Sequence, residues 1–528
     1  MVDLFHDLIQ NSATTRPNAE ALCYQHETLT YASLAQQVEQ IAQGFSALGL
    51  RRGDRLAIYL EKRFESVIAM FAATRAGGVF VPVNPGLKSG QVAHILYDCG
   101  ARILITSAAR FAMLQPTVLS QTTLHTVVVV DDTHHEYSTI ANLRMVPWGV
   151  IQAMNAHCSV KVIDNDMAAI IYTSGSTGKP KGVVFSHRNL VAGARSVSSY
   201  LHNDVEDRIL TVLPLSFDYG LSQLTTTFYV GATNVLMNYL LPRDILDHVN
   251  EYKITGLAAV PSLWIQLAAL NWRETDSLRY ITNSGGTMPV PIIQQLRTML
   301  PKTKIFLMYG FTEAFRSTYL VPEEIDRRPN SIGKAIPNAE VLVLRQDGTA
   351  CEPEEPGELV HRGATVAMGY WNDREKTAKT FKPMMTQQND LPLSEIVAWS
   401  GDTVKMDAEG FLYFIERRDA LIKSSGYRIS PTEIEEILYD IESINEVVAF
   451  GVPHAALGQG IVVIVTTKPG AILDIDTVSQ ACKNKLPAYM CPHHIEIRRS
   501  DLPKNSNGKI DRHRLAQEMQ HFFTQSQA

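Results

Sequence analysis

Hydrophobic and polar positions change period repeatedly along the first 320 residues. Short apolar runs at 56–60, 79–83 and 103–106 predict buried strands. Between them, residues 31–48 and 65–75 carry apolar side chains at the spacing of an amphipathic helix. Strands that alternate with helices form parallel sheets covered on both faces. The pattern therefore predicts an α/β fold.

The pattern changes near residue 330, where short strand-like runs are separated by turn signals such as Asp347-Gly348. We read 330–416 as a β-rich subdomain of a large N-terminal domain, residues 1–416, that contains two covered parallel-type sheets. The charged segment 416–419 then precedes a new α+β pattern. The sequence therefore predicts a small second domain at 417–528.

Composition excludes several classes of protein. The 528 residues are 45% hydrophobic and 19% charged, as in ordinary soluble domains. A net charge of −6 argues against nucleic-acid binding. The six cysteines form no CxxC pair, which favours a reducing compartment. Neither a signal peptide nor an apolar run of membrane-spanning length is evident. We therefore expect a cytoplasmic protein with no membrane or nucleic-acid partner.

A loop rich in glycine, hydroxyls and lysine follows the apolar run 167–172. Glycine lets the backbone approach a ligand, and hydroxyl, N–H and ammonium groups suit a polyphosphate. The spacing is not that of a P-loop, because Gly175 and Gly178 are too close and Pro180 follows the lysine. An ordinary surface loop is the alternative. The candidate phosphate-binding residues are Thr173, Ser174, Gly175, Ser176, Thr177, Gly178, Lys179 and Lys181.

Three more segments carry candidate chemistry. Thr312 and Glu313 follow a predicted strand, where a hydroxyl and a carboxylate suit phosphate and Mg²⁺, although a surface turn would look similar. Asp402 follows a glycine and could accept hydrogen bonds from a ribose diol. Lys509 lies in a polar loop and alone would pass for a solvated lysine. No single segment decides the function.

Together with the segment 417–430, these motifs stand in the order and spacing of the adenylate-forming superfamily, which the chain resembles from 171 to 512. That superfamily includes acyl-CoA synthetases, the adenylation domains of nonribosomal peptide synthetases, and beetle luciferases. The resemblance implies a mobile C-terminal domain with a hinge near Asp419 and with Gly426 beside a thiol channel. Glu416 stands where the family usually has glycine, which could alter the hinge, and Ser400 replaces a commoner threonine.

The resemblance also implies ATP and Mg²⁺ as cofactors. Thr312 would contact the α-phosphate and Glu313 would bind the metal. Lys509 would bridge the substrate carboxylate and the α-phosphate, neutralising charge as it develops. A domain rotation would then withdraw Lys509 so that a thiol attacks the acyl-adenylate. The implied adenosine-binding residues are Gly285, Gly286, Tyr309, Gly310, Asp402, Phe414 and Arg417.

The acid is suggested by Phe217-Asp218. Acyl-CoA synthetases usually have a histidine at this point, whereas peptide-synthetase adenylation domains have Phe-Asp, and that aspartate binds the α-ammonium of an amino acid. A carboxylate in an apolar pocket is costly unless paired. Capping a helix, or pairing with Arg316, are the alternatives for Asp218. The resemblance places around the substrate Tyr219, Ser222, Ala258, Thr282, Ser284, Met308 and Arg316.

We therefore expect a stand-alone enzyme that converts an amino acid and ATP to aminoacyl-AMP and pyrophosphate. The acyl group would pass to the phosphopantetheine thiol of a separate carrier protein. Tyr219 and Met308 narrow the pocket, so the acid is expected to be small or cyclic, with proline one candidate. An acyl-CoA ligase that uses free CoA is the alternative. A catalytically silent nucleotide-binding paralogue is more remote, since Lys509 and Glu313 are intact.

Overall fold

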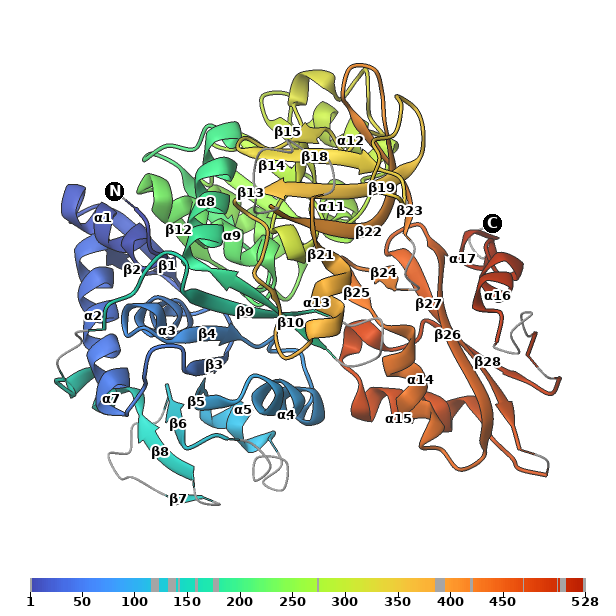
Figure 1. The fold of residues 1–528 in the computed structure, drawn as a ribbon, viewed down its shortest axis with the longest axis horizontal. Coiled ribbons are helices and arrows are strands. Elements are labelled where there is room, and N and C mark those ends of the chain that lie inside the picture. Colours follow the sequence, from blue (N-terminus) through green and yellow to red (C-terminus); the bar gives the residue numbers. More distant parts are fainter. Residues whose placement is uncertain are drawn as a thin grey trace.

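The described residues form four sheets (Figure 1). Within this described part, the first two sheets each contain nine strands and the last two each contain five. The computed structural model describes residues 2–114, 123–131, 139–140, 143–156, 160–173, 180–272, 275–384, 395–417, 421–468, 470–500, 502–503 and 510–525.

The first sheet has the order β17-β16-β15-β14-β13-β11-β12-β1-β2, and its strands from β15 to β1 run parallel. Its strands are β1 (Glu20–Tyr24), β2 (Glu27–Thr30), β11 (Arg208–Thr211), β12 (Thr233–Leu236), β13 (Gly256–Ala259), β14 (Tyr280–Asn283), β15 (Lys304–Tyr309), β16 (Thr318–Leu320) and β17 (Lys334–Ala335). The helices around it are α1 (Asp7–Thr15), α8 (His187–Leu201), α9 (Asp218–Val230), α10 (Pro242–Glu251), α11 (Pro261–Ala268) and α12 (Val290–Met299).

The second sheet has the order β20-β10-β9-β4-β3-β5-β6-β8-β7, and it too is parallel at its centre. Its strands are β3 (Arg55–Tyr59), β4 (Val79–Pro82), β5 (Ala101–Thr106), β6 (Thr126–Val129), β7 (Thr139–Ile140), β8 (Leu143–Pro147), β9 (Met167–Thr173), β10 (Lys181–Ser186) and β20 (Gly369–Tyr370). Its helices are α2 (Tyr31–Ala47), α3 (Phe64–Arg75), α4 (Ser89–Asp98), α5 (Ala108–Ala112) and α7 (Trp148–Ala153).

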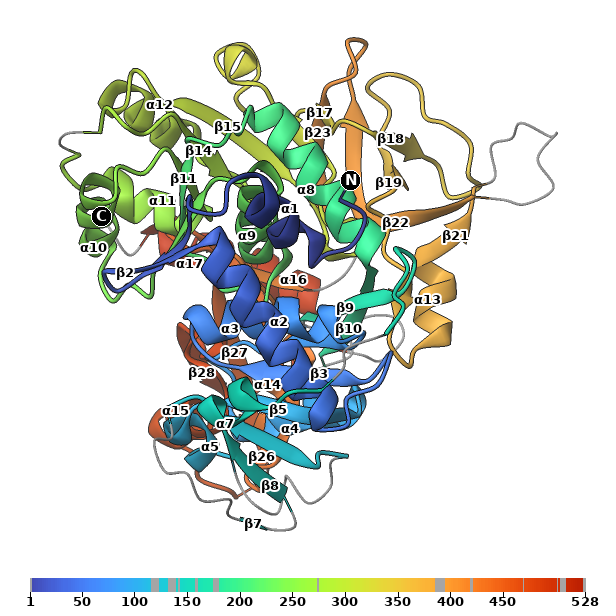
Figure 2. The ribbon, with the colours of Figure 1, turned by 90° about the vertical axis from the view of Figure 1, so that its left-hand side faces the viewer.

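Helices from both sheets share one apolar core. Phe71 on α3 meets Phe228 on α9 edge to face, with ring centroids 5.5 Å apart. Both side chains are fully buried, and they belong to one cluster that extends across both sheets. Figure 2 shows α2 and α3 beside α1 and α9 between the two sheets. This core fixes the sheets relative to each other, which matters because the site draws residues from both.

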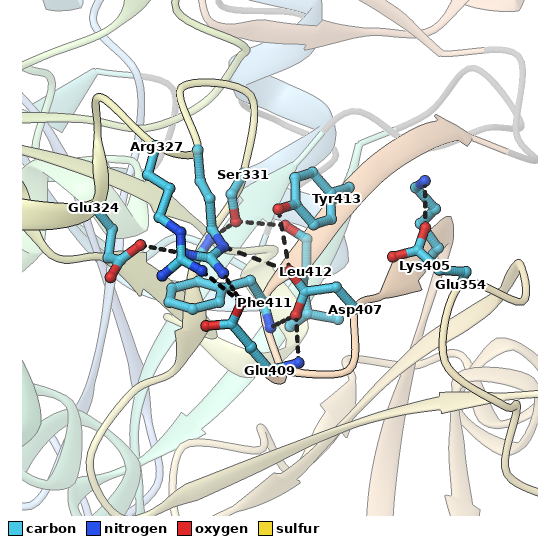
Figure 3. A network of polar contacts seen from close by, with 12 residues as sticks. Glu324, Arg327, Ser331, Glu354, Lys405, Asp407, Glu409, Phe411, Leu412 and Tyr413 are labelled. Carbon is cyan, nitrogen blue, oxygen red and sulfur yellow. Dashed lines mark hydrogen bonds and ion pairs between the residues drawn. The ribbon is translucent and has the colours of Figure 1, made fainter.

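The third sheet is antiparallel and contains β18 (Ala339–Leu344), β19 (Gly357–Gly363), β21 (Phe381–Pro383), β22 (Ile396–Met406) and β23 (Leu412–Arg417), next to α13 (Arg374–Thr380). The segment between β16 and β17 joins it to the first sheet, and Figure 3 shows Arg327 of this segment paired with Glu409. The Arg328 guanidinium pairs with Asp407 and Glu409 at the β22–β23 turn and lies over the Phe411 ring. This network holds residues 329–332 beside the β-rich subdomain.

The fourth sheet forms the C-terminal part and contains β24 (Ile422–Ser424), β25 (Tyr427–Ile429), β26 (Ile444–His454), β27 (Gly458–Thr467) and β28 (His494–Arg498). One of its faces packs on α14 (Pro431–Tyr439) and α15 (Ile475–Lys485). The opposite face packs on α16 (Arg512–Glu518) and α17 (Phe522–Gln525). In Figure 1, α16 and α17 lie on the side away from the rest of the chain.

These features confirm the predicted α/β fold, with two covered, largely parallel sheets, a β-rich part and a smaller α+β part. The helices expected at 31–48 and 65–75 are α2 and α3. Ser186 caps α8 by accepting a hydrogen bond from the Asn189 backbone. The division between residues 416 and 417 stays a prediction. Within the described ranges, no helix is long and apolar enough to span a membrane.

Candidate active site

Two adjoining cavities lie at the carboxyl ends of the parallel strands of the first sheet. This edge is where open α/β sheets commonly bind ligands. The larger cavity has a volume of about 460 Å³ and reaches from the second sheet to the C-terminal hairpin. The smaller has a volume of about 290 Å³ and lies beside residues 329–332. Gly285, Gly310 and Arg428 line both.

Glu313 forms the most polar cluster beside the larger cavity. It follows β15 in a short 3-10 helix, η1 (Thr312–Ala314), and its Oε1 accepts hydrogen bonds from Lys181 Nζ at 2.9 Å and from the Tyr370 hydroxyl at 2.5 Å. Burial would raise the pKa of Glu313, but the charges of Lys181 and Arg428 and the Tyr370 bond lower it well below its usual range. Glu313 is therefore an anion at neutral pH.

The predicted phosphate-binding segment flanks this cluster. Thr173 ends β9 and lines the larger cavity, as do Pro180 and Thr312. Lys181 begins β10, and its Nζ lies 4.3 Å from the centre of the Tyr370 ring. The intervening Ser174, Gly175, Ser176, Thr177, Gly178 and Lys179 lie outside the described residues.

The smaller cavity collects part of the predicted adenosine-binding set, but Asp402 does not line it. Gly285, Gly286, Tyr309, Gly310 and Phe414 all line it. The Tyr309 hydroxyl donates to Asp402 Oδ2 at 2.5 Å, and the Asp402 side chain is fully buried. Arg417 ends β23, and its side chain is outside the described part. Met308, predicted to contact the substrate, lines this smaller cavity instead.

The larger cavity collects part of the predicted substrate set. Asp218, Tyr219, Ser284 and Arg316 line it. Arg316 Nη1 lies 3.8 Å from Asp218 Oδ2, within ion-pair distance but too far for a hydrogen bond. Burial raises the pKa of Asp218 even though Arg316 and Arg428 lower it. Asp218 therefore lies near Arg316, the alternative partner named from the sequence. Because the two side chains form no hydrogen bond, Arg316 compensates the charge of Asp218 only in part.

Three other predicted substrate residues lie behind the residues that line the larger cavity. Thr282 in β14 bonds through its hydroxyl to the Tyr219 hydroxyl at 2.6 Å. Ser222 in α9 and Ala258 in β13 are buried. None of the three lines the larger cavity. The Tyr219 ring, held by Thr282, therefore closes the cavity on this side and shortens the space for a substrate.

The C-terminal part supplies one wall of the larger cavity. Ser425 and Gly426 both have positive φ, at 51° and 81°, and form the two-residue turn between β24 and β25. A Cβ on Gly426 would lie 2.7 Å from Val260 Cγ1, so only glycine permits this approach. Arg428 Nη2 donates to the Gly310 carbonyl at 3.4 Å. Gly426 therefore lines the larger cavity, and its place beside a thiol channel stays a prediction.

Sequence reasoning missed Tyr370 and Arg428. Arg428 stands in the segment 417–430, which was singled out without giving this residue a role. Tyr370 belongs to β20, which pairs with β10 across the chain, so no local spacing marks it. Lys509 and Asp419 lie outside the described residues, and their predicted roles stay predictions. Ile510, next to Lys509, packs with the α16 face of the fourth sheet.

Comparisons with known proteins define the class. The AMP-binding enzyme profile matches residues 9–371, and the AMP-binding enzyme C-terminal domain profile matches 433–509. A Bacillus subtilis long-chain-fatty-acid–CoA ligase is 27% identical over 97% of this chain and 94% of its own length. A Streptomyces coelicolor L-proline–[L-prolyl-carrier protein] ligase is 31% identical over 93% of this chain and 92% of its own.

Two complexes of one solved relative match this chain with different TM-scores. A double mutant of Bacillus subtilis o-succinylbenzoate CoA synthetase, bound with its product analogue, has a TM-score of 0.83, with 27% identity over 97% of this chain and 98% of its own. The same synthetase in complex with ATP and a magnesium ion has a TM-score of 0.68, with 27% identity over 96% and 98%.

Fold, site and relatives together define an ATP-binding, AMP-forming acid–thiol ligase. The chain belongs to the AMP-binding enzyme family.

Proposed function

We propose that this enzyme activates an amino acid as its adenylate and loads it onto the phosphopantetheine thiol of a separate carrier protein. The supporting observation is Asp218. Its carboxylate lies in the larger cavity with a raised pKa and no hydrogen-bonded cation, so an approaching α-ammonium would find an anion in need of a partner. The carrier-protein ligase from Streptomyces coelicolor supports the same reading, with proline as one candidate acid.

The site residues have separate roles in adenylation. The smaller cavity takes the adenosine, with Asp402 on the ribose side, and Thr312 faces the α-phosphate. Glu313 is an ionised carboxylate held by two donors, which fits Mg²⁺ sites where nucleotide phosphates supply most ligands. Mg²⁺ would supply charge neutralisation for those phosphates. The substrate carboxylate then attacks the α-phosphorus and pyrophosphate leaves, with Lys509 stabilising the charge that develops.

The described arrangement supports the second half-reaction. The TM-score is higher with the synthetase bound with its product analogue than with the same synthetase in complex with ATP and magnesium. Gly426 and Arg428 line the larger cavity, whereas Ile510 lies on the opposite face of the fourth sheet. We therefore propose that the C-terminal part rotates between a state that brings Lys509 to the α-phosphate and the present state, which admits the thiol.

An acyl-CoA ligase acting on a carboxylic acid without an amino group is the second candidate. The contact between Asp218 and Arg316 favours it, because the arginine already compensates part of the aspartate charge. The fatty-acid ligase relative is consistent with this reading. In this case free CoA would replace the carrier protein as thiol donor.

Substrate-dependent ATP–pyrophosphate exchange separates the two candidates. The purified chain is tested with the proteinogenic amino acids and, in parallel, with acids that match them but lack the amino group. We expect exchange with an amino acid and a much larger loss for that acid than for its deamino analogue in Asp218→Asn. Exchange with the deamino acids alone would refute amino-acid activation. The absence of any pyrophosphate release would instead indicate the silent paralogue. Holo-carrier proteins and CoA are then compared as acceptors.

A further inference from the structure

We propose that Arg316 selects the acid by binding a second carboxylate, so that the preferred substrate is an amino acid whose short side chain ends in an acidic group. This inference rests on the proposed amino-acid activation. It concerns the side chain of the substrate, whereas the residues that activate the carboxylate do not determine which side chain is accepted.

Arg316 is buried and only partly paired. Its side chain is 2% exposed and belongs to the largest fully buried side chains of the described structure. Nη1 donates to the Phe315 carbonyl at 2.9 Å. Nε and Nη2 have no hydrogen-bond partner among the described residues. Buried donors without partners are rare and costly, so an acceptor is expected to complete this site.

Arg316 lines the larger cavity and directly follows a strained turn. Phe315 has φ 60° and ψ −56°, and the Arg316 backbone N–H donates to the Ala314 carbonyl at 2.6 Å. This is a γ-turn of the rare, strained form. Such strain persists where the surroundings impose it, commonly at ligand sites. Here the Phe315 ring packs against Gly193, where a Cβ would come within 2.7 Å of it.

Aromatic rings leave only the edge of the guanidinium available. The Tyr219 ring centre lies 4.6 Å from the Arg316 carbon Cζ, and the Phe315 ring centre lies 5.6 Å from it. Nε and Nη2 form one edge of the planar group, and two parallel N–H donors on one edge match the two oxygens of a carboxylate. Both unpaired atoms are buried in the described structure, so a carboxylate would reach this edge when the side chains around it shift.

The neighbouring Asp218 limits which acids fit. Its carboxylate lies 3.8 Å from Arg316, so adjacent charges of opposite sign face the substrate. An amino acid with a short acidic side chain presents an ammonium and a carboxylate at comparable spacing. Proline and long-chain fatty acids have no second carboxylate that could accept from Nε and Nη2 while the first is activated. These acids would leave the arginine donors unpaired, which a binding site penalises strongly.

Pyrophosphate exchange with the full-length chain tests this inference through kcat/KM. The panel contains L-aspartate, L-glutamate, L-alanine, L-proline, succinate and glutarate. We expect L-aspartate or L-glutamate to exceed L-alanine and L-proline by about 10²-fold or more. Arg316→Met should abolish most of that preference, measured as the ratio of kcat/KM for each acidic amino acid to kcat/KM for L-alanine within the same variant. Arg195→Met, at an exposed position of α8, is the matched control and should leave every ratio unchanged.

The outcomes separate the two proposals. Preference for succinate or glutarate over both acidic amino acids, lost in Arg316→Met, would support the role of Arg316 and refute amino-acid activation. Preference for L-proline or L-alanine in the wild type would refute the role of Arg316 while supporting amino-acid activation. Lack of exchange with every acidic compound would also refute the role of Arg316. The wild-type comparison decides these points even if the variant fails to fold.

Discussion

The hydrogen bond between Tyr309 and Asp402 joins residues from two sheets. Tyr309 ends β15 in the first sheet and Asp402 lies in β22 of the third, and both side chains are buried. Tyr309→Phe removes one donor from a buried carboxylate, which should lower the free energy of unfolding by about 1–3 kcal/mol. The KM for ATP should rise as well, because Tyr309 lines the smaller cavity, which is the predicted adenosine site. Thermal unfolding and ATP titration measure both effects.

Tyr413→Phe is the control for this prediction. Its hydroxyl donates to Asp407 at 3.2 Å in a part-buried position, so its loss should have a smaller effect on unfolding and none on the KM for ATP. Equal changes in the two variants would show that the Tyr309 bond has no special relation to the nucleotide.

At this scale, sequence reasoning identified residues that stand in compact motifs. Thr312 and Glu313 follow a strand directly, so their position at the edge of the sheet could be predicted locally. Tyr370 could not, because its contact with Glu313 spans 57 residues and depends on pairing between β20 and β10. The pairing of Asp218 with Arg316, in contrast, was one of the alternatives that the sequence offered, although no sequence pattern signals the γ-turn that precedes Arg316.

The hairpin of β24 and β25 is one of the elements through which the C-terminal part lines the larger cavity. Gly426→Ala would place a methyl group 2.7 Å from Val260 and force alanine into a φ of 81°. The docked arrangement should therefore weaken by at least about 1 kcal/mol. We expect thioester formation from supplied acyl-adenylate to fall about tenfold, whereas pyrophosphate exchange stays within about twofold.

Gly470→Ala provides the matched control, since Gly470 has a similar φ of 77° but no atoms within 4 Å of the position that a Cβ would take. It carries the same backbone cost without the contact. If this variant lost thioester formation as strongly as Gly426→Ala, the approach to Val260 would not be the cause.

The contact between α14 and α4 should depend on pH. Glu433 Oε1 accepts from Gln91 at 2.6 Å, and burial raises the pKa of Glu433 to about 7. The docked state therefore holds a proton that a solvated glutamate releases near its ordinary pKa of 4.5. Docking should weaken as pH rises from about 4.5 to 7 and stay constant above, with a total change of at most about 3 kcal/mol.

Small-angle X-ray scattering between about pH 5 and pH 8 measures this change as an increase in the radius of gyration. Glu433→Gln should remove the pH dependence, since glutamine stays neutral and retains an acceptor oxygen. Glu436→Gln, on the exposed side of the same helix, should keep it. An unchanged profile in Glu433→Gln would contradict the assignment to this carboxyl group.

Most elements could be predicted from local sequence, because their periodicity and caps are local. Ser186 marks the start of α8, and Gly231, with φ 77°, ends α9 as expected for a C-terminal glycine. The order of strands could not be predicted. β1, from the beginning of the chain, pairs with β12 more than 200 residues later, and such pairing depends on packing across the whole core rather than on local pattern.

For the molecule as a whole, the two faces of the fourth sheet have different neighbours. The α14 side meets the cavity, and the face that packs on α16 and Ile510 does not. If Lys509 acts only after rotation, Lys509→Ala should lower adenylation by about 10²-fold or more. Thioester formation from supplied aminoacyl-adenylate should be almost unchanged. Single-turnover assays of each half-reaction measure the two rates separately.

Lys302→Ala, which removes an exposed lysine paired with Asp276, is the control and should leave both half-reactions unchanged. A Lys509→Ala variant that lost both half-reactions equally would argue against separate states for the two steps.

The shared wall of the larger cavity has a consequence for chimeric enzymes. Residues 425–428 border the same space as Asp218 and Arg316, although they come from the opposite end of the chain. Grafting the last hundred or so residues from a homologue would thus alter acid selectivity along with carrier recognition. A chimera of this enzyme should therefore retain the native β24–β25 hairpin together with the native N-terminal part, and the junction should follow the hairpin.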